Sequence, residues 1–419
     1  MPLEQGARLR MDSLGQVEWD SGHPQNLRVM EPMMLNRREA LILGTFTLGG
    51  LSTGKYLSAD AIPGTDALDA LAREYIKNGK AAGLGVGVCR NGKVTLCRAY
   101  GYADVATQKP LDIHSVFRIA SVTKTFTAIA ILQLKNQGKI SLTDPLSRFL
   151  PRFPRSGEVT VRQLMSHTAG VHDYVFGGLP PGTSRHWTST AEFVTRLAKV
   201  DPLYDFDPGT RFAYSNSGYI LLGAVIEEAS GQTYESFLSE HIFEPLGMSD
   251  TAVDHTGDSV PDRALGYGLK GNQPGQFVQV NDDGMLPFSA GAIRSSLADL
   301  LRWQQAFFAG KLLPMADVIL MSTPSKTTDG KLVDDARWFP RGVNPKRPDF
   351  LTSDNYGLGL EIAVAYGHKS IGHDGGISGY NSIVEHFPED DSDLILLANT
   401  NNGVVDLWMK IIDSMGHSN

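Results

Sequence analysis

Apolar and polar residues follow two different periods along this chain. Residues 66–83 have apolar positions at helical spacing and end in glycine, which predicts a first helix. Residues 83–90 and 93–104 follow as two predicted β-strands, joined by Asn91-Gly92, a dipeptide that favours a tight hairpin turn. The pattern therefore predicts a β-hairpin soon after the first helix.

Helical periods dominate the middle of the chain, and strands return near its end. Predicted helices cover 160–170, 189–200, 217–231, 233–248, 295–310 and 403–416, and predicted late strands cover 356–367, 369–376, 379–389 and 393–400. We expect an α/β (α+β) fold, in which one antiparallel sheet built from both ends of the chain is flanked by helices and carries a large, mostly helical insertion. The expected division is a sheet domain of residues 62–119 with 290–419 and a helical domain of residues 120–289, with the active site in the cleft between them.

Residues 1–61 indicate an upstream extension and an export signal. Arg37 and Arg38 precede an apolar stretch at 40–51, and Ala59 and Ala61 have the spacing of a signal-peptidase site. The stretch is too short to span a bilayer. We expect export to the periplasm or the exterior through a twin-arginine signal cleaved near Ala61; a buried N-terminal helix is the alternative.

The composition of the chain limits the classes of binding partner that we expect. The 419 residues are 42% hydrophobic and 20% charged, with a formal net charge of -8 and no basic run. Nucleic acid and anionic membranes are attracted by basic patches, so neither is an expected partner, and no membrane span is expected in the mature chain. A small-molecule substrate is the remaining expectation, and oligomeric state is not predicted.

The two cysteines, Cys89 and Cys97, flank the predicted hairpin turn. With the turn centred on Asn91-Gly92, Cys97 lies opposite Val86, and the odd offset sends the two sulfur atoms to opposite faces. We therefore expect no disulfide unless a β-bulge shifts the register. Two cysteines also make no cysteine-rich zinc site.

Ser121 and Lys124 open an apolar segment that extends to Leu134. Positions three apart share a helical face, so the lysine amine and the serine hydroxyl should be neighbours. Burial lowers the pKa of a lysine, and a lysine that loses its proton can accept one from serine. Taken alone, the pair fits an N-capping serine beside a solvent-reaching lysine better than it fits a catalytic pair.

Two further motifs carry polar groups. Tyr214 and Asn216 precede a predicted helix; the phenol can transfer a proton and the amide can hold a substrate carbonyl or the lysine. His373, Asp374 and a Gly375-Gly376 pair lie on a late strand, where glycines allow close approach of a substrate and an edge amide can donate to an oxyanion.

Together, Ser-x-x-Lys, Tyr-x-Asn and His-x-Gly in this order resemble the serine β-lactamase and penicillin-binding-protein-like hydrolases. The resemblance covers roughly residues 66–419 and includes the branch with class C β-lactamases, D-alanyl-D-alanine carboxypeptidases, D-aminopeptidases and β-lactamase-like esterases. It implies a β-lactamase/transpeptidase-like fold and a serine hydrolase that works through an acyl-enzyme without a cofactor.

By position, the resemblance implies that Ser121 is acylated and that Lys124 and Tyr214 share the base and acid work. Asn216 would orient the substrate, His373, Asp374 and Gly375 would line its site, and the backbone N–H groups of Ser121 and Gly376 would form the oxyanion hole.

His-Asp-Gly departs from the Lys-Thr-Gly that β-lactamases usually have. A histidine is only partly charged near neutral pH, and Asp374 repels a carboxylate unless it points away. We therefore expect neutral esters, or amides without a nearby carboxylate, to be better substrates than anionic β-lactams. A class C-like β-lactamase or a D-alanyl-D-alanine carboxypeptidase is the alternative, and a penicillin-binding-type sensor that does not turn over is the alternative from another class.

Three other patterns are set aside. Ser52 with Lys55 repeats the Ser-x-x-Lys spacing, and Gly50 to Gly54 matches G-x-S-x-G, but both lie in the predicted signal. His167, His172 and Asp173 suggest a metal site, but their spacing does not place them on one helical face, and no metal is expected.

Overall fold

The computed structural model describes residues 62–175, 187, 189–255, 257–280, 287–333, 351–401 and 403–416, together with the paired strands β1 (Leu9–Met11) and β2 (Val17–Trp19). The predicted export signal around Arg37 and Arg38 lies outside the described residues, so it stays a prediction. No helix in these described ranges is both long and apolar enough to cross a membrane.

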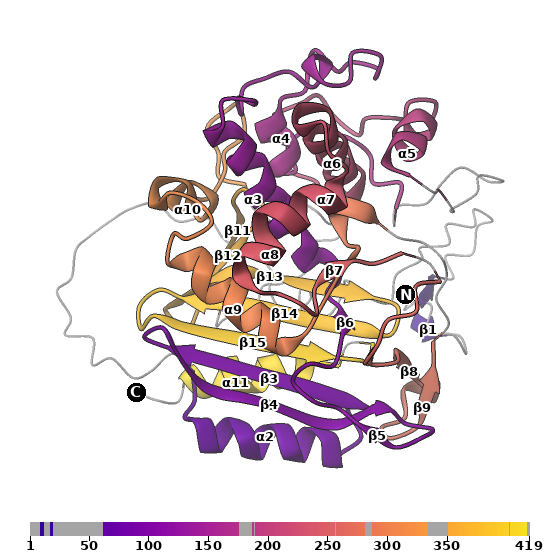
Figure 1. Ribbon diagram of the computed structural model, residues 1–419, viewed down its shortest axis with the longest axis vertical. Coiled ribbons are helices and arrows are strands. Elements are labelled where there is room, and N and C mark those ends of the chain that lie inside the picture. Colours follow the sequence, from indigo (N-terminus) through magenta and orange to yellow (C-terminus); the bar gives the residue numbers. More distant parts are fainter. Residues whose placement is uncertain are drawn as a thin grey trace, which may run out of the picture.

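One large sheet organises the molecule (Figure 1). Its spatial order is β11 (Leu351–Tyr356), β12 (Glu361–Ala365), β13 (His368–Ile377), β14 (Tyr380–Phe387), β15 (Ser392–Ala398), β3 (Gly83–Arg90), β4 (Lys93–Asp104) and β5 (Lys109–Pro110), and every neighbouring pair is antiparallel. The β15–β3 pair joins the late strands to the early hairpin. The prediction of one antiparallel sheet built from both ends of the chain is therefore confirmed.

Helices cover both faces of this sheet. Helices α2 (Thr65–Lys77) and α11 (Val405–Gly416) lie on one face, and α9 (Leu297–Phe308) lies on the other, below the remaining helices (Figure 1). The remaining α-helices are α3 (Thr123–Asn136), α4 (Val161–Met165), α5 (Thr190–Leu197), α6 (Asn216–Ser230), α7 (Tyr234–Leu238), α8 (Glu244–Leu246) and α10 (Met315–Met321).

Short elements connect the layers. A three-stranded sheet contains β6 (Phe117–Arg118), β10 (Ile293–Ser295) and β7 (Ala252–Val253), and β8 (Tyr267–Leu269) pairs with β9 (Phe277–Gln279). The single-turn helices are η1 (Ala120–Val122), η2 (Leu146–Arg148), η4 (Lys270–Asn272) and η5 (Phe288–Ala290), and η3 (Ser239–Phe243) is a π-helix. The division into a sheet domain and a helical domain stays a prediction.

Residues 234–246 form the continuous helical run that the period of residues 233–248 predicts, with a π-helical stretch in its middle. The segment divides into α7, the π-turn η3 and α8, and Pro245 stands in the first turn of α8. A proline ring carries no N–H and is tolerated in a first turn but not inside a helix. The wider turn of η3 therefore has a local cause in the sequence, the proline that follows it.

The alternating side chains of β15 supply two cores. Leu394 and Leu396 pack with the apolar side of α2 and α11, whereas Ile395 and Leu397 pack on the other face, in a core that continues into α3 and α6. All four side chains are fully buried. A continuous apolar run is the expected composition of a strand that is covered on both faces.

The β3–β4 hairpin corrects the predicted cysteine register. Cys97 pairs with Gly87 instead of Val86, because a bulge between Val88 and Cys89 leaves one extra residue on β4. Both cysteines now contact the same core, on the α9 face of the sheet. They are free thiols in the structure, and burial raises the pKa of Cys89 to about 12.

Candidate active site

Ser121 lies where the chain passes from the short strand β6 into α3. It sits in the single turn η1, and Ala120 immediately before it has φ 47°, a left-handed conformation that is costly for a residue with a Cβ. Lys124 follows in the first turn of α3 and is fully buried. Its Nζ donates a hydrogen bond of 3.0 Å to Ser121 Oγ, so the predicted neighbours do lie side by side.

Two further segments bring acceptors to the same amine. Lys124 Nζ donates to Asn216 Oδ1 at 2.7 Å and to the backbone oxygen of Ala290 at 2.7 Å. Asn216 is the first residue of α6, and Ala290 ends η5. The sequence prediction missed Ala290, because a backbone carbonyl can belong to any residue type and leaves no signal in the sequence.

Glycine makes the approach of η5 to α6 possible. A Cβ at Gly223 would lie 2.2 Å from Ser289 Oγ, which is far closer than real Cβ contacts. Ser289 Oγ instead donates a hydrogen bond of 2.9 Å to the backbone oxygen of Tyr219. This close packing holds the neighbouring Ala290 carbonyl over Lys124.

Tyr214 borders the lysine with its aromatic ring. Lys124 Nζ lies 4.7 Å from the ring centroid, within the range of a cation–π contact. The ring packs against His167, at 4.3 Å between centroids, and against Tyr356, at 6.3 Å. His167 Nδ1 accepts a hydrogen bond of 3.0 Å from the backbone N–H of Ser215, which fixes the loop that carries Tyr214. The sequence prediction considered His167 only as a possible metal ligand, and it missed Tyr356.

The third motif lies on β13, which is an inner strand rather than the predicted edge strand. Its pairing with β12 ends at Gly372, opposite Glu361, so residues 373–377 pair only with β14. A local edge is thus created inside the sheet. A Cβ at Gly375 would lie 3.1 Å from the backbone nitrogen of Ser121 and 2.3 Å from the backbone oxygen of Ile119, so this approach requires glycine.

The backbone of this local edge alternates in direction. Gly375 O faces β14, where it accepts from Asn381 Nδ2 at 2.8 Å, and Asp374 O accepts from the ring of His373. Amide groups along a strand point to opposite sides in turn, so Gly376 shares the side of Asp374. This side is free of β12, as an oxyanion donor requires.

His373 is enclosed rather than open to solvent. Its side chain is 1% exposed, its Nδ1 lies 2.6 Å from Asp374 O, and its Nε2 lies 3.1 Å from the Tyr356 hydroxyl. Because a carbonyl oxygen only accepts, Nδ1 is the donor. Both ring nitrogens are therefore engaged, and the role of His373 on the substrate wall stays a prediction.

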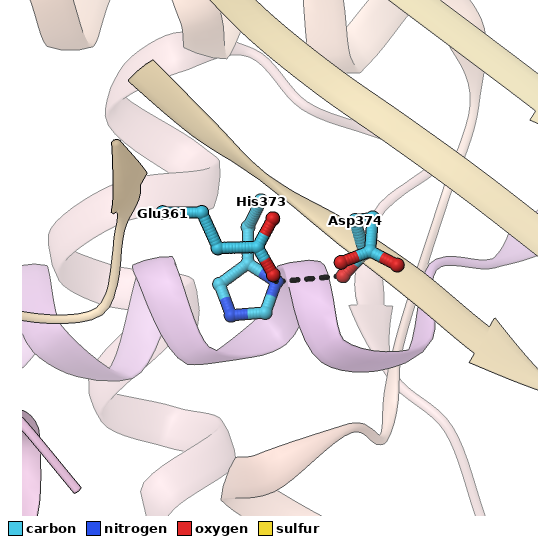
Figure 2. Close-up of side chains that lie close together, drawn as sticks. All are labelled: Glu361, His373 and Asp374. Atoms are coloured by element: carbon cyan, nitrogen blue, oxygen red, sulfur yellow. Dashed lines mark hydrogen bonds and ion pairs between the residues drawn. The ribbon is translucent and has the colours of Figure 1, made fainter. Parts of the chain in front are cut away.

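Two carboxylates accompany this histidine (Figure 2). Glu361 Oε1 lies 3.8 Å from His373 Nδ1, and ligand atoms of Glu361, His373 and Asp374 all lie within 4.8 Å of one another. The carboxylates offset any positive charge on the imidazole. The three residues have the composition of a metal site, but a metal ion would have to displace one of the hydrogen bonds of the ring.

The residues considered as a metal site have separate partners. His167 contacts the Tyr214 loop, His172 Nδ1 lies 2.7 Å from Asp205, and Asp173 Oδ2 accepts from Asn216 Nδ2 at 2.9 Å. Asp173 is thus a neighbour of the site for another reason. Ser52 and Lys55 lie outside the described residues.

The sequence and the fold of this chain are similar to those of known proteins. A family model described as Beta-lactamase matches residues 68–410. The chain belongs to this beta-lactamase family. Among curated relatives of this family member, Penicillin-binding protein 4* of Bacillus subtilis is 28% identical over 74% of the chain and 66% of its own length. Protein flp of Staphylococcus aureus is 29% identical over 56% of the chain and 47% of its own length. The chain thus spans about half to two thirds of the length of these relatives.

Solved structures share the fold. D-amino acid amidase from Ochrobactrum anthropi, in complex with D-phenylalanine, is 25% identical with a TM-score of 0.68, over 84% of this chain and 99% of that one. The octameric penicillin-binding protein homologue from Pyrococcus abyssi is 24% identical with a TM-score of 0.67, over 84% and 76%. The β-lactamase/transpeptidase-like fold expected from the sequence is confirmed, and the chain is a member of a serine hydrolase superfamily.

Proposed function

We propose that this protein hydrolyses ester or amide bonds of small molecules through an acyl-enzyme on Ser121. The supporting observation is the 3.0 Å hydrogen bond from the buried Lys124 Nζ to Ser121 Oγ, beside two further neutral oxygen acceptors of the same amine. A lysine in such surroundings is a base for the adjacent hydroxyl once it has lost its proton.

The reaction has two balanced halves. Ser121 Oγ attacks the substrate carbonyl carbon, its proton passes to the Lys124 and Tyr214 pair, and the leaving alcohol or amine departs with a proton from that pair. Water then attacks the acyl ester, gives up a proton to the same pair, and the Ser121 hydroxyl is restored. The N–H groups of Ser121 and Gly376 stabilise the oxyanion in both halves. Because the two basic groups are coupled, the proton acceptor is the pair rather than one residue.

The charges around the third motif support a substrate without a carboxylate. Glu361 and Asp374 surround His373, where β-lactamases usually place a lysine that attracts the carboxylate of the antibiotic. The similarity to D-amino acid amidase, a neighbour crystallised with D-phenylalanine, adds D-amino acid amides to the substrates to be tested. We propose esters and such amides ahead of penicillins and cephalosporins.

A fluorophosphonate label tests the nucleophile. Purified protein should gain one covalent adduct at Ser121. Ser121→Ala should not form this adduct, and its turnover of p-nitrophenyl butyrate should be lower by more than about 1,000-fold. Ser147→Ala is the matched control, because this serine lies in the short helix η2, away from the site. Full labelling of Ser121→Ala would refute the proposal.

A substrate panel tests the specificity. We expect p-nitrophenyl butyrate or D-phenylalanine amide to be turned over faster than nitrocefin. Nitrocefin turnover well ahead of both would instead support the class C-like β-lactamase, and rapid release of D-alanine from D-alanyl-D-alanine peptides would support the carboxypeptidase. Stable labelling without release of product from any substrate would support a sensor.

A further inference from the structure

The side-chain amide of Asn216 has a hydrogen-bond donor at its oxygen and a hydrogen-bond acceptor at its nitrogen. Its Oδ1 accepts from Lys124 Nζ at 2.7 Å, and its Nδ2 donates to Asp173 Oδ2 at 2.9 Å. If the amide were turned end for end, its NH2 group would face the lysine amine and its oxygen would face the carboxylate. Both contacts would then be unfavourable, so the carboxylate selects the orientation in which oxygen faces Lys124.

Asp173 is itself held in place by the start of α6. Its Oδ1 accepts from the backbone N–H of Val175 at 3.1 Å, and the backbone N–H of Tyr174 donates to Ser217 Oγ at 3.0 Å. The carboxylate thus faces Asn216 from a loop that is anchored to the same helix. Hydrogen bonds link Asp173 to Asn216 and Asn216 to Lys124, and the last bond of this chain joins Lys124 to Ser121.

Burial raises the pKa of the Asp173 carboxyl, while the hydrogen bonds from Asn216 and Val175 and the charge of Lys124 act in the opposite direction. The charged groups that face it are Lys124 from α3 and His172 from its own loop. When protonated, Asp173 could donate to an amide oxygen and would no longer select one orientation of Asn216.

We infer that Asp173 is a positioning residue for the acylation reaction, which holds the amide of Asn216 with its oxygen toward Lys124 and thereby keeps the lysine amine against Ser121. This inference rests on the proposed function. Asp173 does not touch the reacting atoms; it acts through Asn216 and Lys124.

The test compares Asp173→Ala and Asp173→Asn with the wild type in turnover of p-nitrophenyl butyrate. We expect kcat to fall about 10- to 100-fold in Asp173→Ala, with KM changed less than threefold, because a small displacement of the amine slows proton transfer more than it weakens binding. Asp173→Asn keeps the shape but can present an NH2 group to Asn216, so an intermediate loss of kcat is expected. Asp173→Glu, which keeps the carboxylate, should recover part of the loss.

A pH profile separates positioning from a structural role. The pKa of Asp173 is raised, so at a pH above the ordinary range of an aspartate the wild type should lose more kcat than protonation of the Lys124 and Tyr214 pair alone causes, and Asp173→Asn should lack this additional loss. Asp207→Asn is the matched control: it removes an exposed carboxylate that pairs with Arg155 rather than with His172, and its kcat and acid limb should match those of the wild type.

The outcomes distinguish this inference from the proposed function. If Ser121→Ala is inactive while Asp173→Ala keeps kcat and an unchanged pH profile, the inference is wrong and the proposed function stands. A lower melting temperature in Asp173→Ala with unchanged kcat at a permissive temperature also overturns the inference, because it indicates only a structural role. If Ser121→Ala remains active, the proposed function itself fails.

Discussion

Lys124 is the residue on which the proposed chemistry most depends, because its amine contacts the serine hydroxyl and two further oxygens. Lys124→Ala should reduce kcat/KM for p-nitrophenyl butyrate by about 100- to 10,000-fold, the usual range for loss of a general base. Lys139→Ala, at an exposed lysine just after the same helix, should keep wild-type activity. Circular dichroism of both variants checks that they fold; a folded Lys124→Ala with near wild-type kcat/KM would contradict the proposed role.

At the scale of single residues, the sequence predicted the pairs that are near neighbours along the chain. Ser121 and Lys124 stand three positions apart on a helical start, so local geometry alone places them together. The contact of Lys124 with the Ala290 carbonyl could not be predicted, since that carbonyl comes from a distant turn. The same applies to Tyr356, which reaches His373 only because β11 joins the sheet edge, and β11 was not predicted as a separate strand.

Among the elements, β13 and the turn η1 meet so closely that a glycine is required between them. In Gly375→Ala, the new Cβ would lie 2.3 Å from Ile119 O and 3.1 Å from Ser121 N, so one of these backbone segments must move. We expect kcat to fall by about 100-fold through displacement of the oxyanion donors.

Gly85→Ala is the matched control for this substitution. Gly85 lies in β3 of the same sheet, where a Cβ would meet its nearest atom, from Leu297, at an ordinary 3.6 Å. This variant should retain the wild-type kcat. Kinetics of p-nitrophenyl butyrate hydrolysis, measured after both variants are shown to fold, provide the readout. Equal kcat values in the two variants would mean that the approach of β13 to Ser121 is not needed for turnover.

Most elements followed from their periods, and the exceptions have local causes. The strand at 369–376 was predicted correctly, but its place inside the sheet depends on β12, whose pairing ends at Gly372. The register of the β3–β4 hairpin was wrong by one residue, because a bulge is a backbone feature that side-chain alternation does not reveal.

At the scale of the whole molecule, the two-ended sheet was predictable because strand patterns occur only at the two ends of the predicted order. What the pattern could not give is which late strand meets the early hairpin. In the structure it is β15, whose inward and outward side chains enter two different cores. The site lies on the face of the sheet that α9 covers, and α2 and α11 cover the opposite face (Figure 1).

This separation predicts that stability and activity can be changed independently. Leu396 is fully buried on the α2 and α11 side of β15, so Leu396→Ala leaves a cavity and should lower the free energy of unfolding by about 2–5 kcal/mol. Val278→Ala, at a side chain that is 51% exposed on β9, should change this free energy by less than about 0.5 kcal/mol. Urea unfolding measures the free energy of unfolding of both variants.

The second measurement is activity. At a temperature where both variants are folded, both should hydrolyse p-nitrophenyl butyrate with wild-type kcat, since Ser121 and Lys124 lie beyond the opposite face of the sheet. A folded Leu396→Ala with strongly reduced kcat would show that the two faces are coupled.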